Sequence, residues 1–301
     1  MELLHIDTFQ IARRFAQAGQ SYDEHAIIQK KIAHRLMQLM TEHAIVHQSA
    51  DQKIVQNSVQ KSAQSSVQSS AEKSAPNTDG THDQNRVFEI GCGSGNLTKR
   101  FIEYHCFDTL YLNDLYPEVK QHFEADQFAY KQAHAQPFKD QPFKNHKFKD
   151  QHSKDQEIKA HTIHEPINRD DKVPDHITGH HGLIEWRMGD AETIEFPQQL
   201  NLIISSSAMQ WMRDLEGLFK KCNQALLDHG FLCFSTFGKS NLREIKALTQ
   251  QGLAYYHLAE IQQKLEQQGF EVLHISEQVS TLSFKHPKHV LQHLKATGVT
   301  A

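Results

Sequence analysis

Cysteine is scarce in this chain, and its few thiols follow no metal-binding or disulfide pattern. The 301 residues include 4 cysteines, and no two of them form a CxxC pair. Cysteines paired at short spacing are typical of zinc sites, and a high density of cysteine is typical of secreted disulfide frameworks. The sequence therefore predicts reduced, mostly packed thiols and no metal site. The four positions are Cys92, Cys106, Cys222 and Cys233.

Long apolar runs and an excess of positive charge are also missing. No run approaches the roughly 20 apolar residues that cross a bilayer, and Met1 to His5 do not begin a basic segment followed by an apolar core, as a secretory signal would. The formal net charge of −4 gives no overall attraction to nucleic acid or to an anionic membrane. We expect a cytoplasmic protein that binds neither nucleic acid nor membrane, and we expect a monomer.

Hydrophobic residues make up only 38% of the chain, and the shortage is local. Residues 47–85 are rich in Ser, Gln, Ala, Asn and Lys, and residues 131–182 are rich in Lys, His and Asp with near-copies such as Pro137-Phe138-Lys139-Asp140 and Lys147-Phe148-Lys149-Asp150. Such segments bury too little apolar surface to offset an ordering cost of roughly 1–2 kcal/mol per residue. We interpret both as inserts in a single domain, 1–301, of ordinary α/β size.

The second insert carries a group of histidines that suggests metal binding. The group has no regular helical ligand spacing and no accompanying cysteine, so we favour a solvated segment with adventitious metal affinity only. Its members are His134, His146, His152, His161, His164, His176, His180 and His181.

A glycine-rich stretch, Glu89-Ile90-Gly91-Cys92-Gly93-Ser94-Gly95, is the strongest functional signal. Apolar residues 87–90 before it predict a buried strand, and residues 97–102 after it have helical spacing. Glycine permits positive φ and close ligand approach, and a helix start offers free N–H groups to an anion. The spacing is one residue shorter than the dinucleotide fingerprint G-x-G-x-x-G. An ordinary tight turn is the alternative; Cys92 is interpreted as a small filler and not as a nucleophile.

An acid follows the next predicted strand, at 109–115. Asp114 lies about 20 residues beyond the glycines, where an acid accepts hydrogen bonds from ribose hydroxyls in a nucleotide-binding sheet. Alternatively, Asp114 caps a helix over 116–128, and the two roles are compatible. A third strand, 183–188, leads into Gly189-Asp190-Ala191, which can place the Asp190 carboxylate beside the exocyclic amine of an adenine. Trp211, after the fourth strand, is as well explained by core packing as by substrate contact.

The remaining pattern alternates strands and helices, which predicts a doubly wound, mostly parallel, Rossmann-like α/β sheet. The N-terminal residues 1–46 predict a helix over 9–15 and a second, amphipathic helix from 21–23 to Met40. Asp214 is expected to cap a helix that a glycine C-cap at Gly230 closes. The other expected strands are 200–205, 231–237 and 270–276, with a continuation to 284 as the longer alternative for the last. The other expected helices are 241–250, 258–268 and one from Pro287 to Gly298.

Several motifs together resemble the malonyl-[acyl-carrier protein] O-methyltransferases of biotin synthesis, a family of class I S-adenosylmethionine (SAM) methyltransferases. The pieces are Tyr22 to Gln29, Glu89 to Gly95, Gly189 to Glu192, Ala208-Met209-Gln210-Trp211, Phe234 to Gly238 with Leu242-Arg243-Glu244, and Leu294 to Val299. The resemblance implies that residues 1–46 form a helical lid, with Tyr22 and Gln29 closing over the site. It implies SAM as cofactor, held by Glu89, Gly91, Cys92, Gly93, Gly95, Asp114, Leu115, Asp190 and Ala191.

The resemblance also implies the reaction, in which the methyl group of SAM passes to the free carboxylate of malonyl-acyl-carrier protein or malonyl-CoA. A carboxylate is ionised at pH 7, so we expect no catalytic acid or base. Candidates for a basic patch that meets the acidic carrier are Arg13, Arg14, Lys30, Lys31, Lys239, Arg243 and Lys246. Members of this fold usually add a seventh, antiparallel strand, and the sequence up to Ala301 shows none. The alternatives are another SAM-dependent O- or C-methyltransferase and a degenerate SAM-binding protein.

Overall fold

The computed structural model describes residues 10, 13–15, 22, 25–43, 45, 84–123, 181–250 and 252–297. The inserts expected at 47–85 and 131–182 therefore lie outside the described residues, apart from their last two positions. Gln84 and Asn85 lead directly into β1 (Arg86–Ile90), and His181 and Gly182 are the first residues of β3 (His181–Trp186). Among the described residues, no helix has both the length and the hydropathy to cross a membrane.

Five parallel strands form one sheet in the order β3-β2-β1-β4-β5. The other three strands are β2 (Phe107–Asn113), β4 (Leu200–Ser206) and β5 (Leu226–Ser235). The first five predicted strands are thus confirmed in type and order. Strands buried on both faces read as nearly continuous apolar runs, which is the pattern that identified β1 and β4 in the sequence.

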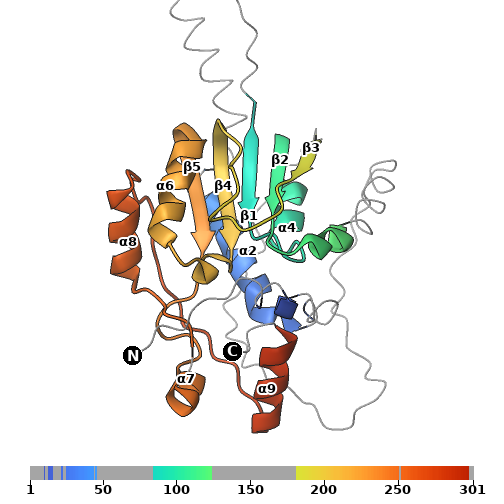
Figure 1. Ribbon diagram of the computed structural model, residues 1–301, viewed down its shortest axis with the longest axis vertical. Coiled ribbons are helices and arrows are strands. Elements are labelled where there is room, and N and C mark those ends of the chain that lie inside the picture. Colours follow the sequence, from blue (N-terminus) through green and yellow to red (C-terminus); the bar gives the residue numbers. More distant parts are fainter. Residues whose placement is uncertain are drawn as a thin grey trace, which may run out of the picture.

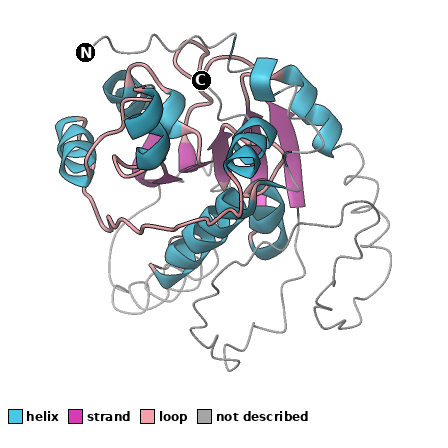
Figure 2. Ribbon diagram, turned by 90° about the horizontal axis from the view of Figure 1, so that it is seen from below, coloured by secondary structure: helices cyan, strands magenta, loops and turns pink. Residues whose placement is uncertain are grey.

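Side chains alternate between the two faces of the sheet, so each strand contributes to two separate cores. In β1, Val87 packs into one cluster, whereas Phe88 and Ile90 pack into the other. The first cluster includes α2 (Ile27–Glu42) and α4 (Thr98–Tyr104), and the second includes α6 (Leu215–Ala225) and α8 (Leu258–Gln267). Figure 2 shows the strands in a row with helices on both sides, which is the doubly wound arrangement that the sequence predicts.

Two further helices, α7 (Arg243–Thr249) and α9 (Pro287–Ala296), lie beyond the carboxyl ends of the strands (Figure 1). Short 3-10 helices follow β2 and β4, at η1 (Pro117–Lys120) and η2 (Met209–Trp211). The helix predicted over 116–128 thus begins as a 3-10 turn, and its expected end lies outside the described residues. Asp214 caps α6 as predicted, because its Oδ1 accepts from the Gly217 amide at 2.9 Å.

The glycine C-cap expected at Gly230 is wrong. Helix α6 ends at Ala225, and β5 starts at once with Leu226 paired to Leu200, whereas the next pairing joins Leu202 to Phe231. The residues between these pairings are an irregularity within the strand, and His229 there has a φ of 64°. The Asp-His-Gly sequence therefore lies within β5, at a shift of its register with β4, and not at the end of the helix.

The sixth strand expected at 270–276 or 270–284 is also wrong. The segment has no regular secondary structure, although Phe270, Val272 and Ile275 pack against the cluster beneath α6 and α8. The alternation of apolar residues therefore reflects the burial of these side chains and not the pairing of a β-strand. Within the described residues all the strands are parallel and β5 forms one edge of the sheet, so no antiparallel neighbour supplies hydrogen bonds to this segment.

Candidate functional site

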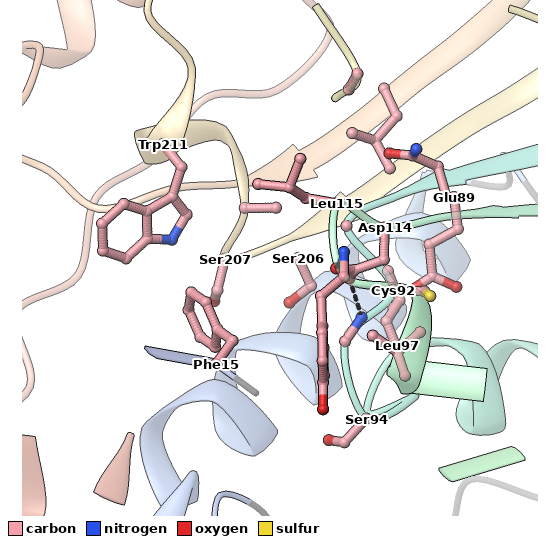
Figure 3. A pocket seen from close by; sticks show the side chains of 18 of the residues that line it. Phe15, Glu89, Cys92, Ser94, Leu97, Asp114, Leu115, Ser206, Ser207 and Trp211 are labelled. Carbon is pink, nitrogen blue, oxygen red and sulfur yellow. Dashed lines mark hydrogen bonds between the residues drawn. The ribbon is translucent and has the colours of Figure 1, made fainter. Parts of the chain in front are cut away.

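A pocket opens at the carboxyl ends of the strands, between β1 and β4. The sheet order places β2 and β3 on one side of this point and β5 on the other, so the connections diverge here. Ligands of doubly wound sheets bind at such a switch point. The pocket is lined by Phe15, Tyr22, Gln29, Glu89, Ile90, Gly91, Cys92, Gly93, Ser94, Asn96, Leu97, Asn113, Asp114, Leu115, Tyr116, Val119, His122, Gly189, Asp190, Ala191, Glu192, Ser206, Ser207, Ala208, Trp211 and Met212. Figure 3 shows ten of these side chains by label.

The glycine loop connects β1 to α4, and at Gly91 and Gly93 the main chain lines the pocket without a side chain in between. Gly91 and Gly93 have φ values of 70° and 54°, a region that only glycine occupies without strain. A Cβ on Gly91 would collide with Ala208, whereas a Cβ on Gly93 would meet no atom within 4 Å. The loop after β1 is therefore packed closely against the loop after β4, and the main chain at Gly93 faces open space that a ligand can occupy.

Asp114 follows β2 and reaches across to the glycine loop. Its Oδ2 accepts a hydrogen bond from the Gly93 amide at 2.8 Å, and its Oδ1 accepts from the Tyr116 amide at 3.1 Å. Burial raises the pKa of the carboxyl group, while the amide donors act in the opposite direction. Asp114 thus lies in the pocket and accepts from the amide of Tyr116, the N-cap residue of η1, while its part in holding a ribose stays a prediction.

Glu89, on β1, is a buried acid beneath the loop. Thr98 Oγ1 donates to Glu89 Oε2 at 2.6 Å, and the side chain is 1% exposed. Burial raises the pKa of Glu89 from 4.5 to about 8, against the opposing effect of the Thr98 hydrogen bond. The neutral acid is therefore favoured when nothing cationic is nearby, because a desolvated carboxylate is costly.

Cys92 has the properties of a packed thiol. It is 4% exposed, and burial raises its pKa well above the ordinary value, with the charges of Asp114 and Glu89 adding to the shift. A thiol in this environment is a poor nucleophile because the thiolate is the reactive form. Its amide donates to Asn113 O at 2.9 Å, so Cys92 joins the loop to the end of β2.

A second network holds the turn Asp190-Ala191-Glu192 against the start of α6. Arg213 Nη2 donates to Asp190 Oδ2 at 3.0 Å, and Arg213 Nε donates to Glu192 Oε2 at 3.2 Å. Lys221 Nζ, from inside α6, donates to the carbonyls of Ala191 and Ile194, each at 2.8 Å. Burial lowers the pKa of Lys221, and its ammonium lies 4.4 Å from the centroid of the Phe196 ring.

Aromatic side chains form the end of the pocket opposite the glycine loop. The Phe15 ring makes edge contacts with Tyr22 and with Trp211, at centroid separations of 5.9 Å and 5.8 Å. Phe15 and Tyr22 come from the N-terminal segment predicted to be a lid, whereas Trp211 comes from η2 after β4. Through this contact, Phe15 of the N-terminal segment packs at the pocket. Trp211 is one of the lining residues and is not only a core residue.

All the predicted cofactor-binding and lid residues except Gly95 line this pocket. Gly95 instead closes the turn: its amide donates to Cys92 O at 2.9 Å, and a Cβ would press on the Phe123 ring. Sequence reasoning missed Phe15, Tyr116 and His122 as lining residues. None of them belongs to a spaced motif; only adjacency to a predicted strand end could have indicated Tyr116.

The charged groups of the lining are mostly acids. The lining contains four acids, Glu89, Asp114, Asp190 and Glu192. Among the described lining residues the one basic side chain is His122, and there is no lysine or arginine. Such a pocket favours a ligand with positive charge. The described part of the chain contains no group of three His, Cys, Asp or Glu side chains that could hold a metal ion.

The sequence matches known methyltransferases over most of its length. A family model for a methyltransferase domain matches residues 56–275. The malonyl-[acyl-carrier protein] O-methyltransferase of Acinetobacter baylyi is 36% identical over 290 residues, which cover 96% of this chain and 78% of the relative. The enzyme of the same name from Bacteroides thetaiotaomicron is 29% identical, with 96% and 77% covered, and that from Bacteroides fragilis is 27% identical, with only 41% of its own length covered.

Solved structures of methyltransferases are similar at a lower level. Phosphoethanolamine N-methyltransferase 2 of Haemonchus contortus, solved with S-adenosylmethionine, has a TM-score of 0.38 and 15% identity over 62% of this chain and 33% of its own. A methyltransferase of Mesorhizobium loti has a TM-score of 0.39 and 15% identity over 64% and 77%. The fold assignment itself rests on the sheet order and the family match. The chain belongs to the malonyl-[acyl-carrier protein] O-methyltransferase family of class I methyltransferases.

Proposed function

We propose that the protein transfers the methyl group of SAM to the free carboxylate of malonyl-[acyl-carrier protein], giving the malonyl methyl ester used in biotin synthesis. The observation that supports this proposal is the pocket at the switch point, where the Gly93 amide donates to Asp114 Oδ2 at 2.8 Å. The chain that forms this pocket is 36% identical to an enzyme of that name. Malonyl-CoA is the simpler acceptor with the same reacting carboxylate.

The residues of the pocket fit SAM, whose sulfonium and ammonium groups make it cationic. Gly93 leaves room for the methionine portion, and Asp114 keeps lone pairs for the ribose hydroxyls beyond its two amide partners. Asp190 and Ala191 supply acceptor and surface for the adenine. Glu89 and Asp114 are buried acids of the lining whose pKa burial raises, and a bound cation would favour their ionised forms and be attracted by them.

The reaction needs no general acid or general base from the protein. The bound cofactor supplies an electrophilic methyl group. The acceptor carboxylate has an unperturbed pKa near ~4 and is already the nucleophile at pH 7. The protein must hold the carboxylate oxygen in line with the methyl carbon and exclude water, and orientation of this kind can contribute roughly 7–11 kcal/mol. Phe15, Tyr22 and Trp211 provide the apolar wall that excludes water.

The acceptor is carried by an acidic protein, so basic residues near the pocket mouth are expected to receive it. The start of α2 carries Lys30 and Lys31, and α7 carries Arg243 and Lys246. Lys239 is paired with Glu260 at 3.4 Å and Arg243 with Glu244 at 2.9 Å, so these two would have to exchange partners. The carrier contact, the monomeric state and the cytoplasmic location remain predictions.

The direct test is methyl transfer from SAM to malonyl-[acyl-carrier protein], followed by mass spectrometry of the acyl group. We expect a gain of one methyl group on the malonyl carrier and none on the acetyl carrier, which lacks the free carboxylate. A protein that binds SAM but methylates neither would contradict the proposal and favour the degenerate binding protein. Methylation of a different small molecule, with the malonyl carrier untouched, would favour another O- or C-methyltransferase.

A further inference from the structure

The loop after β4 holds Ser207 in an unusual backbone conformation. Its φ is 58°, which is uncommon for a residue with a side chain. The conformation is clamped from both sides, because the Ser207 amide donates to Ser235 O at 3.1 Å and Gln210 Nε2 donates to Ser207 O at 2.5 Å. Strained residues held in this way occur where a side chain must be aimed at a ligand.

The Ser207 hydroxyl has no partner among the residues that the structure describes. Ser207 Oγ is buried and makes no hydrogen bond there, and the same holds for Gln29 Oε1 on α2. Both residues line the pocket. A buried polar atom that stays unpaired costs free energy, so two of them in one pocket indicate a polar ligand that completes their hydrogen bonds.

The position of Ser207 within the pocket separates it from the predicted cofactor groups. Figure 3 shows Ser207 on the side that carries Phe15 and Trp211, away from Asp114 and Cys92. The ligand at this side is therefore the acceptor. An acceptor carboxylate would find no lysine or arginine among the described lining residues, so apart from His122 it would be held by neutral donors and by the positive charge of the cofactor.

We propose that the Ser207 hydroxyl and the Gln29 amide donate hydrogen bonds to the free carboxylate of the acceptor and so select a malonyl over an acetyl group. This inference rests on the function proposed above. Ser207 can donate directly through its O–H, and a half-turn of the Gln29 amide exchanges its oxygen for its NH₂. Two neutral donors orient the carboxylate without competing with the cofactor for negative charge.

The test is a binding measurement that does not depend on turnover. Each protein is first saturated with sinefungin, a cationic cofactor analogue without a transferable methyl group. Calorimetric titration with malonyl- or acetyl-[acyl-carrier protein] then gives the dissociation constant of each carrier. Ser207→Gly removes the hydroxyl and suits the positive φ, and Gln29→Met removes the amide at similar size. Ser280→Gly and Gln38→Met are matched controls, because both positions are exposed and outside the pocket lining.

We expect the wild-type protein and both controls to prefer the malonyl carrier. Each pocket variant should weaken malonyl-carrier binding about ten-fold or more, the effect of losing a hydrogen bond to a charged group, with acetyl-carrier affinity in the sinefungin-saturated protein unchanged. An unchanged malonyl-to-acetyl ratio in both variants would overturn the inference. If wild-type protein still methylates the malonyl carrier in that case, the proposed function stands; if it does not, the proposed function fails separately.

Discussion

The carboxylate of Asp114 and the amide of Gly93 are joined by a hydrogen bond of 2.8 Å between the ends of two neighbouring parallel strands. The two residues are 21 positions apart in sequence. Register between β1 and β2 brings Ile90 opposite Asn113, so the residues that follow both strands emerge together at one edge of the sheet. One side chain therefore holds the glycine loop in shape and presents a carboxylate to the same pocket.

The first prediction concerns Asp114. Asp114→Ala removes the acceptor of two amides and the carboxylate expected to hold the ribose, so SAM affinity should fall about ten-fold to a hundred-fold. Calorimetric titration with SAM measures the change. Asp228→Ala is the matched control, since Asp228 is exposed on the irregular part of β5. Equal SAM affinity in Asp114→Ala and wild type would remove Asp114 from the site.

The second prediction concerns pH and Glu89. Its pKa rises from 4.5 to about 8 on folding because burial disfavours the carboxylate. The folded state therefore holds a proton that the unfolded state releases, and this stabilising contribution is present below pH 4.5 and is lost as the pH rises toward 8. The free energy of unfolding of the ligand-free protein should decline across this window, and Glu89→Gln should flatten the decline.

Denaturant unfolding at several pH values between about 5 and 8 measures this effect. The glutamine introduced by Glu89→Gln would keep an oxygen that can accept from Thr98 Oγ1, so the variant changes the charge with little change in packing. Parallel pH profiles in wild type and Glu89→Gln would show that Glu89 does not hold its proton in the folded state.

The third prediction separates two glycines of the loop. Gly93→Ala should cost about 1–2 kcal/mol of stability for its left-handed backbone, because its Cβ meets no neighbour. Gly91→Ala should cost more, since its Cβ collides with Ala208. A second substitution, Ala208→Gly, should recover part of the loss in Gly91→Ala and none in Gly93→Ala.

Unfolding curves of the single and double variants give these differences. The order of the two variants should reverse for SAM affinity. Gly93→Ala should weaken SAM binding more than Gly91→Ala, because its new methyl group projects into the space left for the ligand. If Ala208→Gly fails to help Gly91→Ala, the close approach of the two loops is not what requires glycine at position 91.

The fourth prediction concerns Lys221, which donates to two carbonyls of the Asp190 turn. Lys221→Met keeps the apolar stem and removes both donors, which leaves the Ala191 and Ile194 carbonyls unpaired. We expect the KM for SAM to rise several-fold with kcat little changed, because the turn loses its position and the reacting atoms are untouched. Lys220→Met, at the exposed neighbouring position, is the control. A fall in kcat alone would contradict a positioning role.

Much of the site could be predicted because its signals are local. Three glycines between a strand and a helix require a particular backbone, and Asp114 follows the next strand at the spacing that a parallel neighbour imposes. Phe15 carries no such signal. It reaches the pocket only because the N-terminal segment and the β4 loop meet there in three dimensions.

The errors have the same origin. Residues 270–276 alternate apolar and polar side chains, but a strand also needs a hydrogen-bonded neighbour, and sequence alternation does not supply one. At Gly230 the expected helix C-cap was wrong, because the pairing of β5 with β4 already begins at Leu226, directly after the helix.

The sequence by itself determined the five strands of the sheet, the glycine loop, Asp114 and the family, because each depends on residue type and short spacing. Tertiary structure alone decided three features of the site: the Ser207 hydroxyl has no partner among the described residues, the Phe15 and Trp211 rings are in contact, and Arg213 and Lys221 hold the Asp190 turn beside the pocket. The physical reason is that burial and hydrogen-bond pairing are properties of surroundings assembled from distant segments, which no local pattern contains.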